Sequence, residues 1–167
     1  MSGVLQALNV APSCDRGMTW LRGALGLDEG QTPFPWQMEL LRRFVEREAV
    51  SAVDIPTGLG KTATMAVWLV ARALGASLPR RLVYVVDRRV VVDQATEVAE
   101  SLRAWVEKER PVANALGLGD RPLPISTLRG QYVDNREWLE DPSSLAIVVG
   151  TVDMVGSRLL FSGYGVS

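Results

Sequence analysis

Apolar residues form several short, continuous runs along the chain. The runs Leu82–Val86 and Leu145–Val149 contain no polar residue. That length and composition are typical of strands buried on both faces of a parallel sheet. Residues 49–55 and 123–128 are two further candidate strands. The chain is therefore expected to contain at least three short, buried strands.

Helical patterns separate these runs. One begins at Gln37, and a second, Thr62–Leu74, contains no Gly or Pro. A third is predicted from about Arg88 to Glu109, with Asp87 as its N-cap and Pro111 as its stop. The apolar stripe of this third helix is expected at Val91, Ala95, Val98, Leu102 and Trp105.

The remaining segments complete the expected order of elements. Residues 111–122 are predicted to form a loop, and residues 135–139 a helical turn. Gly150 and Thr151 should turn the chain into a last helix that reaches about residue 160. Strand, loop and helix in repetition predict parallel βαβ units, and so an α/β fold with helices on both faces of the sheet.

Composition limits the possible functions. The 167 residues suit one domain, and the net charge of −1 means that contacts to nucleic acid must come from local arginines. A single cysteine rules out an internal disulfide, and the absence of histidine rules out histidine-ligated metals and histidine-based catalysis within these residues. No signal peptide or membrane span is recognised, so we expect a cytoplasmic protein without a membrane partner.

One loop has the composition of a phosphate cradle. Glycines at 58 and 60 allow backbone N–H groups to approach a triphosphate at the start of a helix. Lys61 supplies charge to the β- and γ-phosphates and is the candidate catalytic residue, while the hydroxyl of Thr62 suits Mg²⁺. The residues predicted to bind ATP here are Pro56, Thr57, Gly58, Leu59, Gly60, Lys61 and Thr62.

This loop resembles the first motif of superfamily 2 helicases. Ile55 stands where the general phosphate-loop pattern has glycine, and Pro-Thr-Gly-x-Gly-Lys-Thr is the helicase variant. Upstream, Phe34-Pro35-Trp36-Gln37 looks like the adenine-reading element of the same superfamily. The resemblance makes Phe34 and Gln37 candidate ATP contacts, since an amide can both donate to and accept from adenine. Alternatively, Phe34 and Trp36 are only core or helix-entry residues.

Three strand-end segments resemble later motifs of such motors, whose residues touch the nucleic-acid backbone. They are 86–94, 126–131 and 150–153. The resemblance assigns nucleic-acid contacts to Arg88, Arg89, Gln94, Arg129, Gly130, Thr151 and Asp153. The alternative roles are surface ion pairs for Arg88 and Arg89 and a helix cap for Thr151.

The amino-acid sequences of segments 54–62, 84–94 and 150–161 are similar to those of one family, the CRISPR-associated helicase–nuclease of type I systems. The resemblance extends over about residues 32–165. It implies an ATP- and Mg²⁺-dependent motor that moves along single-stranded DNA and is recruited by an RNA-guided CRISPR surveillance complex for antiviral defence. A restriction-type translocase, an RNA helicase or an inert nucleotide-binding remnant are the alternatives.

The chain departs from that family because no Asp-Glu pair follows Asp153 to orient the attacking water. Residues 32–167 are therefore expected to be an incomplete, RecA-like first motor domain that ends before the Walker B motif. Residues 1–31 would be a peripheral lead-in. We expect the chain alone to lack ATPase and unwinding activity, and to be marginally stable because apolar sheet edges are exposed.

Overall fold

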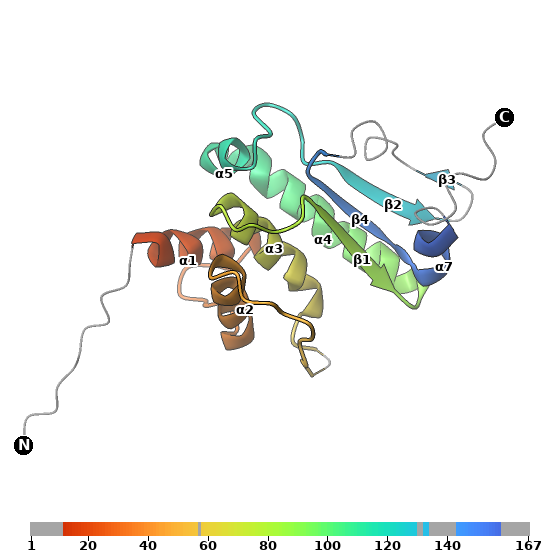
Figure 1. Ribbon diagram of the computed structural model, residues 1–167, viewed down its shortest axis with the longest axis horizontal. Helices are drawn as coiled ribbons and strands as arrows, with labels where there is room; N and C mark the ends of the chain where they lie inside the picture. Colours follow the sequence, from red (N-terminus) through yellow and green to blue (C-terminus); the bar gives the residue numbers. More distant parts are fainter. Residues whose placement is uncertain (1–11, 57, 130–131, 134–142, 158–167) are drawn as a thin grey trace, which may run out of the picture.

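A computed structural model describes residues 12–56, 58–129, 132–133 and 143–157 (Figure 1). The helices are α1 (Pro12–Ala24), α2 (Pro35–Val45), the 3₁₀ turn η1 (Lys61–Ala63), α3 (Thr64–Ala73), α4 (Arg89–Lys108), α5 (Arg110–Ala115) and α7 (Val152–Val155). The strands are β1 (Arg81–Val86), β2 (Ile125–Arg129), β3 (Tyr132–Val133) and β4 (Ala146–Thr151).

The strands form one sheet in the order β1-β4-β2-β3. β4 runs parallel to both β1 and β2, while the two-residue β3 is antiparallel to β2. Val86 pairs with Thr151, and Leu128 pairs with Gly150. The carboxyl ends of the three parallel strands therefore meet at the same edge of the sheet, and the predicted α/β fold with a parallel sheet is confirmed.

Helices cover both faces of this sheet. On one face, Ile147 and Val149 of β4 join the main core, to which α1, α3 and α4 contribute. Figure 1 shows α4 lying along this face. On the other face, Ala146 and Val148 pack with Val155 of the short helix α7. β4 is buried along its whole length because it is the central strand of the parallel part.

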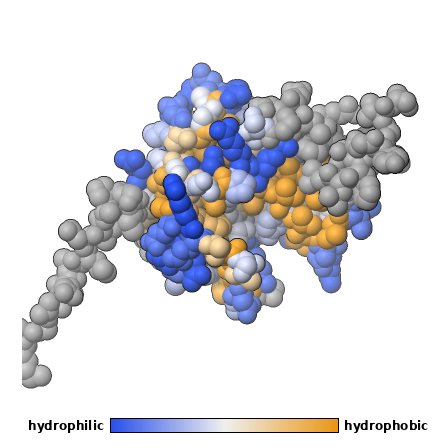
Figure 2. Space-filling view, viewed as in Figure 1, coloured by the Kyte–Doolittle hydropathy of each residue, from blue (hydrophilic) through white to orange (hydrophobic). Residues whose placement is uncertain are grey.

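β1 is the end strand of the described sheet, and its outward residues are exposed. Val83 and Val85 keep 38% and 43% of their surface accessible, and Val152 at the start of α7 is also exposed. Figure 2 shows this apolar surface over the sheet, while charged side chains gather over α2. β1 therefore carries exposed apolar side chains at the end of the described sheet.

Residues 49–55 do not form the strand that their composition predicts. No strand is assigned there, and Ile55 is the only buried residue of the segment. A strand exists only where a neighbour completes its hydrogen bonds, and strand propensity is decided by that pairing. Segment 49–55 pairs with none of the described strands, so it crosses the surface as an extended connection.

The two ends of α4 differ from the prediction. Its N-cap is Arg88, without a side-chain hydrogen bond, and Asp87 lies one residue too early to cap it. The carboxylate of Asp87 instead faces the Arg88 guanidinium at 3.7 Å. At the other end, Pro111 stops α4 but lies in the first turn of α5, where its missing N–H is not needed. The predicted loop therefore begins only after Ala115.

The buried stripe of α4 is displaced by about one residue. It consists of Val92, Ala95, Ala99, Leu102 and Val106. The predicted members Val91, Val98 and Trp105 are half-buried. Contact with α1 explains the position of Trp105, because a Cβ added at Gly23 would lie 2.6 Å from its indole nitrogen. α1 is therefore packed against the core rather than peripheral, and its Leu21 is completely buried.

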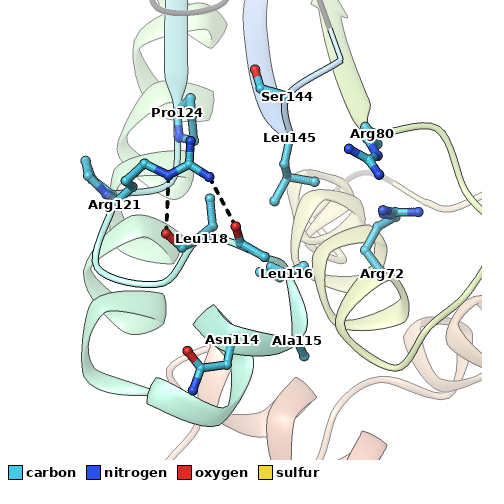
Figure 3. A pocket seen from close by; sticks show the side chains of 12 residues that line it. Arg72, Arg80, Asn114, Ala115, Leu116, Leu118, Arg121, Pro124, Ser144 and Leu145 are labelled. Carbon is cyan, nitrogen blue, oxygen red and sulfur yellow. Dashed lines mark hydrogen bonds between the residues drawn. The ribbon is translucent and has the colours of Figure 1, made fainter. Parts of the chain in front are cut away.

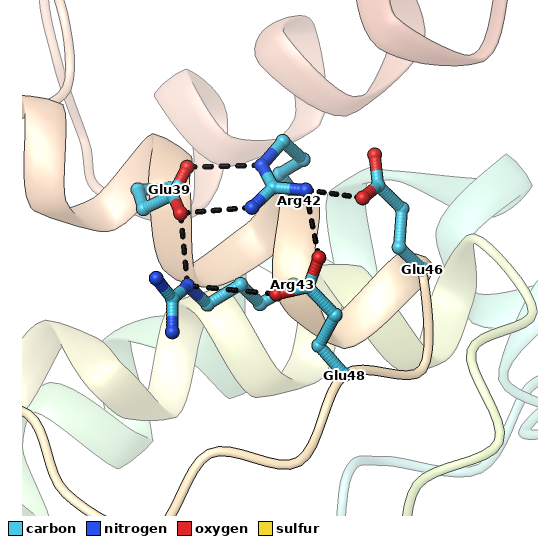
Figure 4. Close-up of polar contacts among 5 residues, drawn as sticks. All are labelled: Glu39, Arg42, Arg43, Glu46 and Glu48. Carbon is cyan, nitrogen blue, oxygen red and sulfur yellow. Dashed lines mark hydrogen bonds and ion pairs between the residues drawn. The ribbon is translucent and has the colours of Figure 1, made fainter.

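A cluster of ion pairs covers the outer side of α2 (Figure 4). Arg42 contacts Glu39 at 2.9 Å, Glu48 at 3.0 Å and also Glu46. Arg43 contacts Glu39 at 2.8 Å. Hydrogen bonds from these two arginines lower the pKa of Glu39 to about 2. All these side chains are more than two-fifths exposed, so each pair stabilises α2 only modestly.

Candidate functional site

The glycine loop has the backbone shape that a phosphate cradle requires. Gly58 and Gly60 have φ values of +91° and +67°, in the left-handed region where other residues are strained. A Cβ at either position would meet no atom within 4 Å, so the space beside both Cα atoms is open. Thr57 lies outside the described residues. The loop therefore leaves room for a ligand to approach the main chain closely.

The chain turns from this loop directly into a helix. Ala63 donates its N–H to the Gly60 carbonyl at 2.9 Å, and the Thr64 hydroxyl donates to the Lys61 carbonyl at 2.9 Å. These bonds tighten η1 and lead into α3, which confirms the predicted helix after the loop. The first N–H groups of a helix have no partner within it and carry a partial positive charge. They fit the phosphates of a nucleotide.

Lys61 and Thr62 lie on the helical turn that directly follows the glycine loop. Lys61 is exposed at the start of η1, and Thr62 is half-buried beside it. A lysine and a hydroxyl on one helical turn are groups that would hold the triphosphate and its Mg²⁺. Pro56 is exposed and Leu59 is half-buried on the approach to this turn.

Gln37 is one of the few buried polar residues, with 4% of its surface exposed. Its Oε1 accepts the N–H of Phe34 at 2.8 Å and so caps α2. This bond fixes the orientation of the amide, and its NH₂ group remains as a donor. Both residues line a cavity of about 610 Å³ together with Gly60 and Ala63. The adenine-reading candidates and the phosphate loop thus share one cavity.

Trp36 is a site residue that sequence reasoning did not identify. Its indole N–H donates to the carbonyl of Leu59 at 3.2 Å, which ties α2 to the glycine loop. A partly buried indole N–H needs an acceptor, so a tryptophan next to Gln37 was the one signal in the sequence for such a contact. Only the fold shows that this acceptor lies 23 residues away in the phosphate loop.

The segment before α2 also contributes to the site. Leu25 and Leu27 line the cavity beside Gln37. A second cavity of about 760 Å³ lies between Thr62, the end of α1 and the middle of α4, where Ser101 borders it. Residues expected to be a lead-in therefore form part of the wall around the phosphate loop.

The strand-end residues meet at the carboxyl edge of the sheet, as expected from parallel strands. Arg88 and Arg89 follow β1 and are both exposed. Thr151 ends β4 and is the N-cap of α7, with 9% exposure and no side-chain capping bond. Arg129 ends β2. Gly130 lies outside the described residues.

The remaining two candidates lie close to this edge. Gln94 is exposed on the second turn of α4, and Asp153 is exposed in the first turn of α7. Because α7 has only four residues, its dipole is too small to make a phosphate site by itself. The exposed arginines are therefore the better candidates for phosphate contacts in this group.

The phosphate loop and the arginines after β1 are separated along α4. The cavity beside Gly60 and Thr62 is bordered by Val98, whereas Arg89 begins the helix. These two positions on α4 are nine residues apart, roughly 13 Å along the axis. The structure therefore contains two polar regions, a nucleotide loop with its cavity and an exposed arginine edge.

Among the residues that the structure describes, no helix is long and apolar enough to cross a membrane. Within the same residues, no three Asp, Glu, Cys or His side chains gather as metal ligands.

Comparison with known proteins gives a family for the chain. No curated protein and no solved structure matches it. Residues 31–160 match the model of the family described as "Type III restriction enzyme, res subunit". The match extends over more than half of the 167 residues and includes the phosphate loop, Gln37 and all strand-end residues. The chain therefore belongs to this family, and its α/β fold is that of a partial superfamily 2 helicase domain with an ATP-dependent, helicase-like function.

Proposed function

We propose that this chain binds ATP with Mg²⁺ and acts in a motor that moves along DNA. The observation that carries the proposal is the shared cavity. The buried amide of Gln37 and the backbone at Gly60 line the same space of about 610 Å³, a volume within the usual range for small-molecule pockets. The Gln37 amide at one end of the cavity suits the base of a nucleotide, and the glycine loop at the other end suits its phosphates.

Each end of the cavity supplies a different part of the recognition. The N–H groups at the start of η1 and the ammonium of Lys61 would bind the phosphates. The oriented amide of Gln37 offers its NH₂ as donor, and its oxygen keeps a second lone pair for the exocyclic amine of adenine. Guanine presents a carbonyl where adenine presents that amine, so ATP is preferred over GTP. Mg²⁺ supplies charge neutralisation at the phosphates when it is bound.

Calorimetric titration with non-hydrolysable ATP and GTP analogues tests this proposal. Gln37→Ala also removes the cap on Phe34, so Gln37→Glu is the sharper variant because it keeps an acceptor oxygen and removes the donor. We expect Gln37→Glu to weaken binding of both nucleotides, because the NH₂ donor to the base is lost, while the remaining acceptor oxygen keeps the preference for ATP. Lys61→Ala should abolish binding of both nucleotides. Unchanged affinity for the ATP analogue in folded Gln37→Glu would remove Gln37 from the site, and full affinity in Lys61→Ala would refute the phosphate loop.

Single-stranded DNA is the proposed track, bound at the arginine edge. Arg88 and Arg89 are exposed and follow a strand end, a position suited to backbone phosphates rather than to reading bases. Replacing both with alanine should weaken DNA binding and reduce the slope of log affinity against log salt by about 1.4, since each phosphate contact contributes about 0.7 on single strands. Arg42→Ala with Arg43→Ala is the matched control, because those adjacent arginines are held in ion pairs on α2. Equal slopes in both double variants would exclude Arg88 and Arg89 from the interface.

A role in CRISPR defence is the finer proposal. It is supported by the amino-acid sequences of segments 54–62, 84–94 and 150–161, which resemble the helicase–nuclease of type I systems more than helicases in general. The expected partner is an RNA-guided surveillance complex that has opened its target DNA. Co-sedimentation with such a complex, with and without target, tests this role. Binding of single-stranded DNA without recognition of the complex would favour a restriction-type translocase instead.

A further inference from the structure

A third cavity, of about 360 Å³, lies at the amino-terminal edge of the sheet (Figure 3). Its lining comes from four separate segments. Arg72 is near the end of α3, Arg80 precedes β1, Arg121 lies between α5 and β2, and Ser144 and Leu145 precede β4. Because β1, β2 and β4 are parallel, this cavity is at the sheet edge opposite the exposed strand-end arginines.

Backbone carbonyls hold all three arginines in place. Arg72 donates to two carbonyls of the turn between α3 and β1, at 2.8 and 3.3 Å. Arg80 donates to the carbonyl of Ser143 at 3.2 Å. Arg121 donates to the carbonyls of residues 117 and 118, at 3.2 and 3.4 Å. Each guanidinium has five N–H donors, so donors remain for a ligand.

The positive charge of the cavity has no acidic counterpart. None of its twelve lining residues is Asp or Glu. None of the three arginines joins an ion pair within the described part of the chain, and nearby Asp120 pairs with Arg110 at 2.6 Å. The buried Nε of Arg72 has no hydrogen-bond partner. Like charges around one cavity repel each other, and an anion between them would remove that cost.

We propose that this cavity binds a small phosphate-bearing molecule. Figure 3 shows Arg121 on one side of the cavity and Arg72 with Arg80 on the other, so donors face it from two directions. Arginine matches phosphate oxygens with paired donors, and three arginines suit a multiply charged anion. Leu116 and Leu118 form an apolar part of the wall. The site therefore accommodates either a free phosphate or the phosphate of a larger molecule whose apolar part contacts the leucines.

The test uses the Lys61→Ala protein, so that binding at the glycine loop cannot contribute. Inorganic pyrophosphate and AMP are titrated by calorimetry. We expect saturable binding of at least one of them, with an affinity that falls as salt is raised. Tighter binding of AMP supports a phosphomonoester ligand, and binding of pyrophosphate alone supports a free phosphate. Because Lys61 is already removed, failure here leaves the ATP proposal unaffected.

Variants locate the site. Arg80→Gln with Arg121→Gln should weaken binding at least about tenfold, because charged hydrogen bonds are lost. Arg16→Gln, a change of the same charge on the exposed surface of α1, should leave it unchanged. Arg72→Gln provides a second variant if the double variant melts early. The proposal is overturned if neither ligand binds, if citrate binds as tightly as both, or if folded arginine variants keep full affinity.

Discussion

The hydrogen bond between Trp36 and Leu59 should set the affinity of the phosphate loop for nucleotide. Trp36→Phe removes the indole N–H and keeps an aromatic ring at the helix entrance. The bond is 3.2 Å long, at the upper end of the normal range, and so contributes about 1 kcal/mol. If the bond holds the loop in its binding shape, that free energy is lost from binding. An affinity about fivefold lower is therefore expected.

A matched variant separates this effect from general loss of stability. Trp68 in α3 also donates its indole N–H to a carbonyl, that of Pro79, at 3.3 Å. Trp68→Phe breaks the same type of bond and should lower the melting temperature. Because the Pro79 turn lies at the far end of α3 from the glycine loop, its nucleotide affinity should stay unchanged.

Calorimetry with a non-hydrolysable ATP analogue measures both variants, since it does not depend on tryptophan fluorescence. The expected pattern is weaker binding in Trp36→Phe alone, with a smaller stability change than in Trp68→Phe. Equal affinity in Trp36→Phe and the unchanged protein would refute the inference that this bond prepares the loop. Equal weakening in both variants would assign the effect to the fold as a whole.

Three further predictions concern the fold. Gly23→Ala should destabilise the protein by about 1–3 kcal/mol in urea unfolding, since the new methyl would lie 2.6 Å from the Trp105 indole nitrogen; an unchanged midpoint would contradict that packing. The hydroxyls of Thr96 and Thr127 are 3.0 Å apart, so either single valine variant should cost about 1 kcal/mol and the double variant less than their sum. Additive losses would show that the two hydroxyls do not interact. Glu39 has its pKa lowered from 4.5 to about 2, so its stabilisation is complete above pH 4.5 and is lost as pH falls towards 2. The urea midpoints of the protein and Glu39→Gln should therefore converge over that interval, and a constant difference would refute the ion-pair origin.

The sequence by itself determined the features that depend on local interactions. The glycine loop followed by a helix is such a feature, since left-handed backbone at Gly58 and Gly60 is a property of the residues themselves. The uninterrupted apolar runs in β1 and β4 likewise predicted the two strands to within about two residues. The resemblance of residues 34–37 to the adenine-reading element placed Gln37 in one candidate site with the phosphate loop, although only the fold shows that Gln37 and Gly60 line the same cavity.

Tertiary structure decided the features that depend on distant partners. Segment 49–55 has strand composition, but composition does not supply a neighbouring strand. The contact of Trp36 with Leu59 joins residues 23 positions apart, and the contact of Arg80 with Ser143 joins residues 63 positions apart. No pattern along the chain encodes such pairs, because they arise when parallel strands and their connections bring separate segments to one edge of the sheet. The glycine loop could therefore be predicted from its own residues. The contact with Trp36 that supports it and the arginine cavity at the opposite edge of the sheet could not.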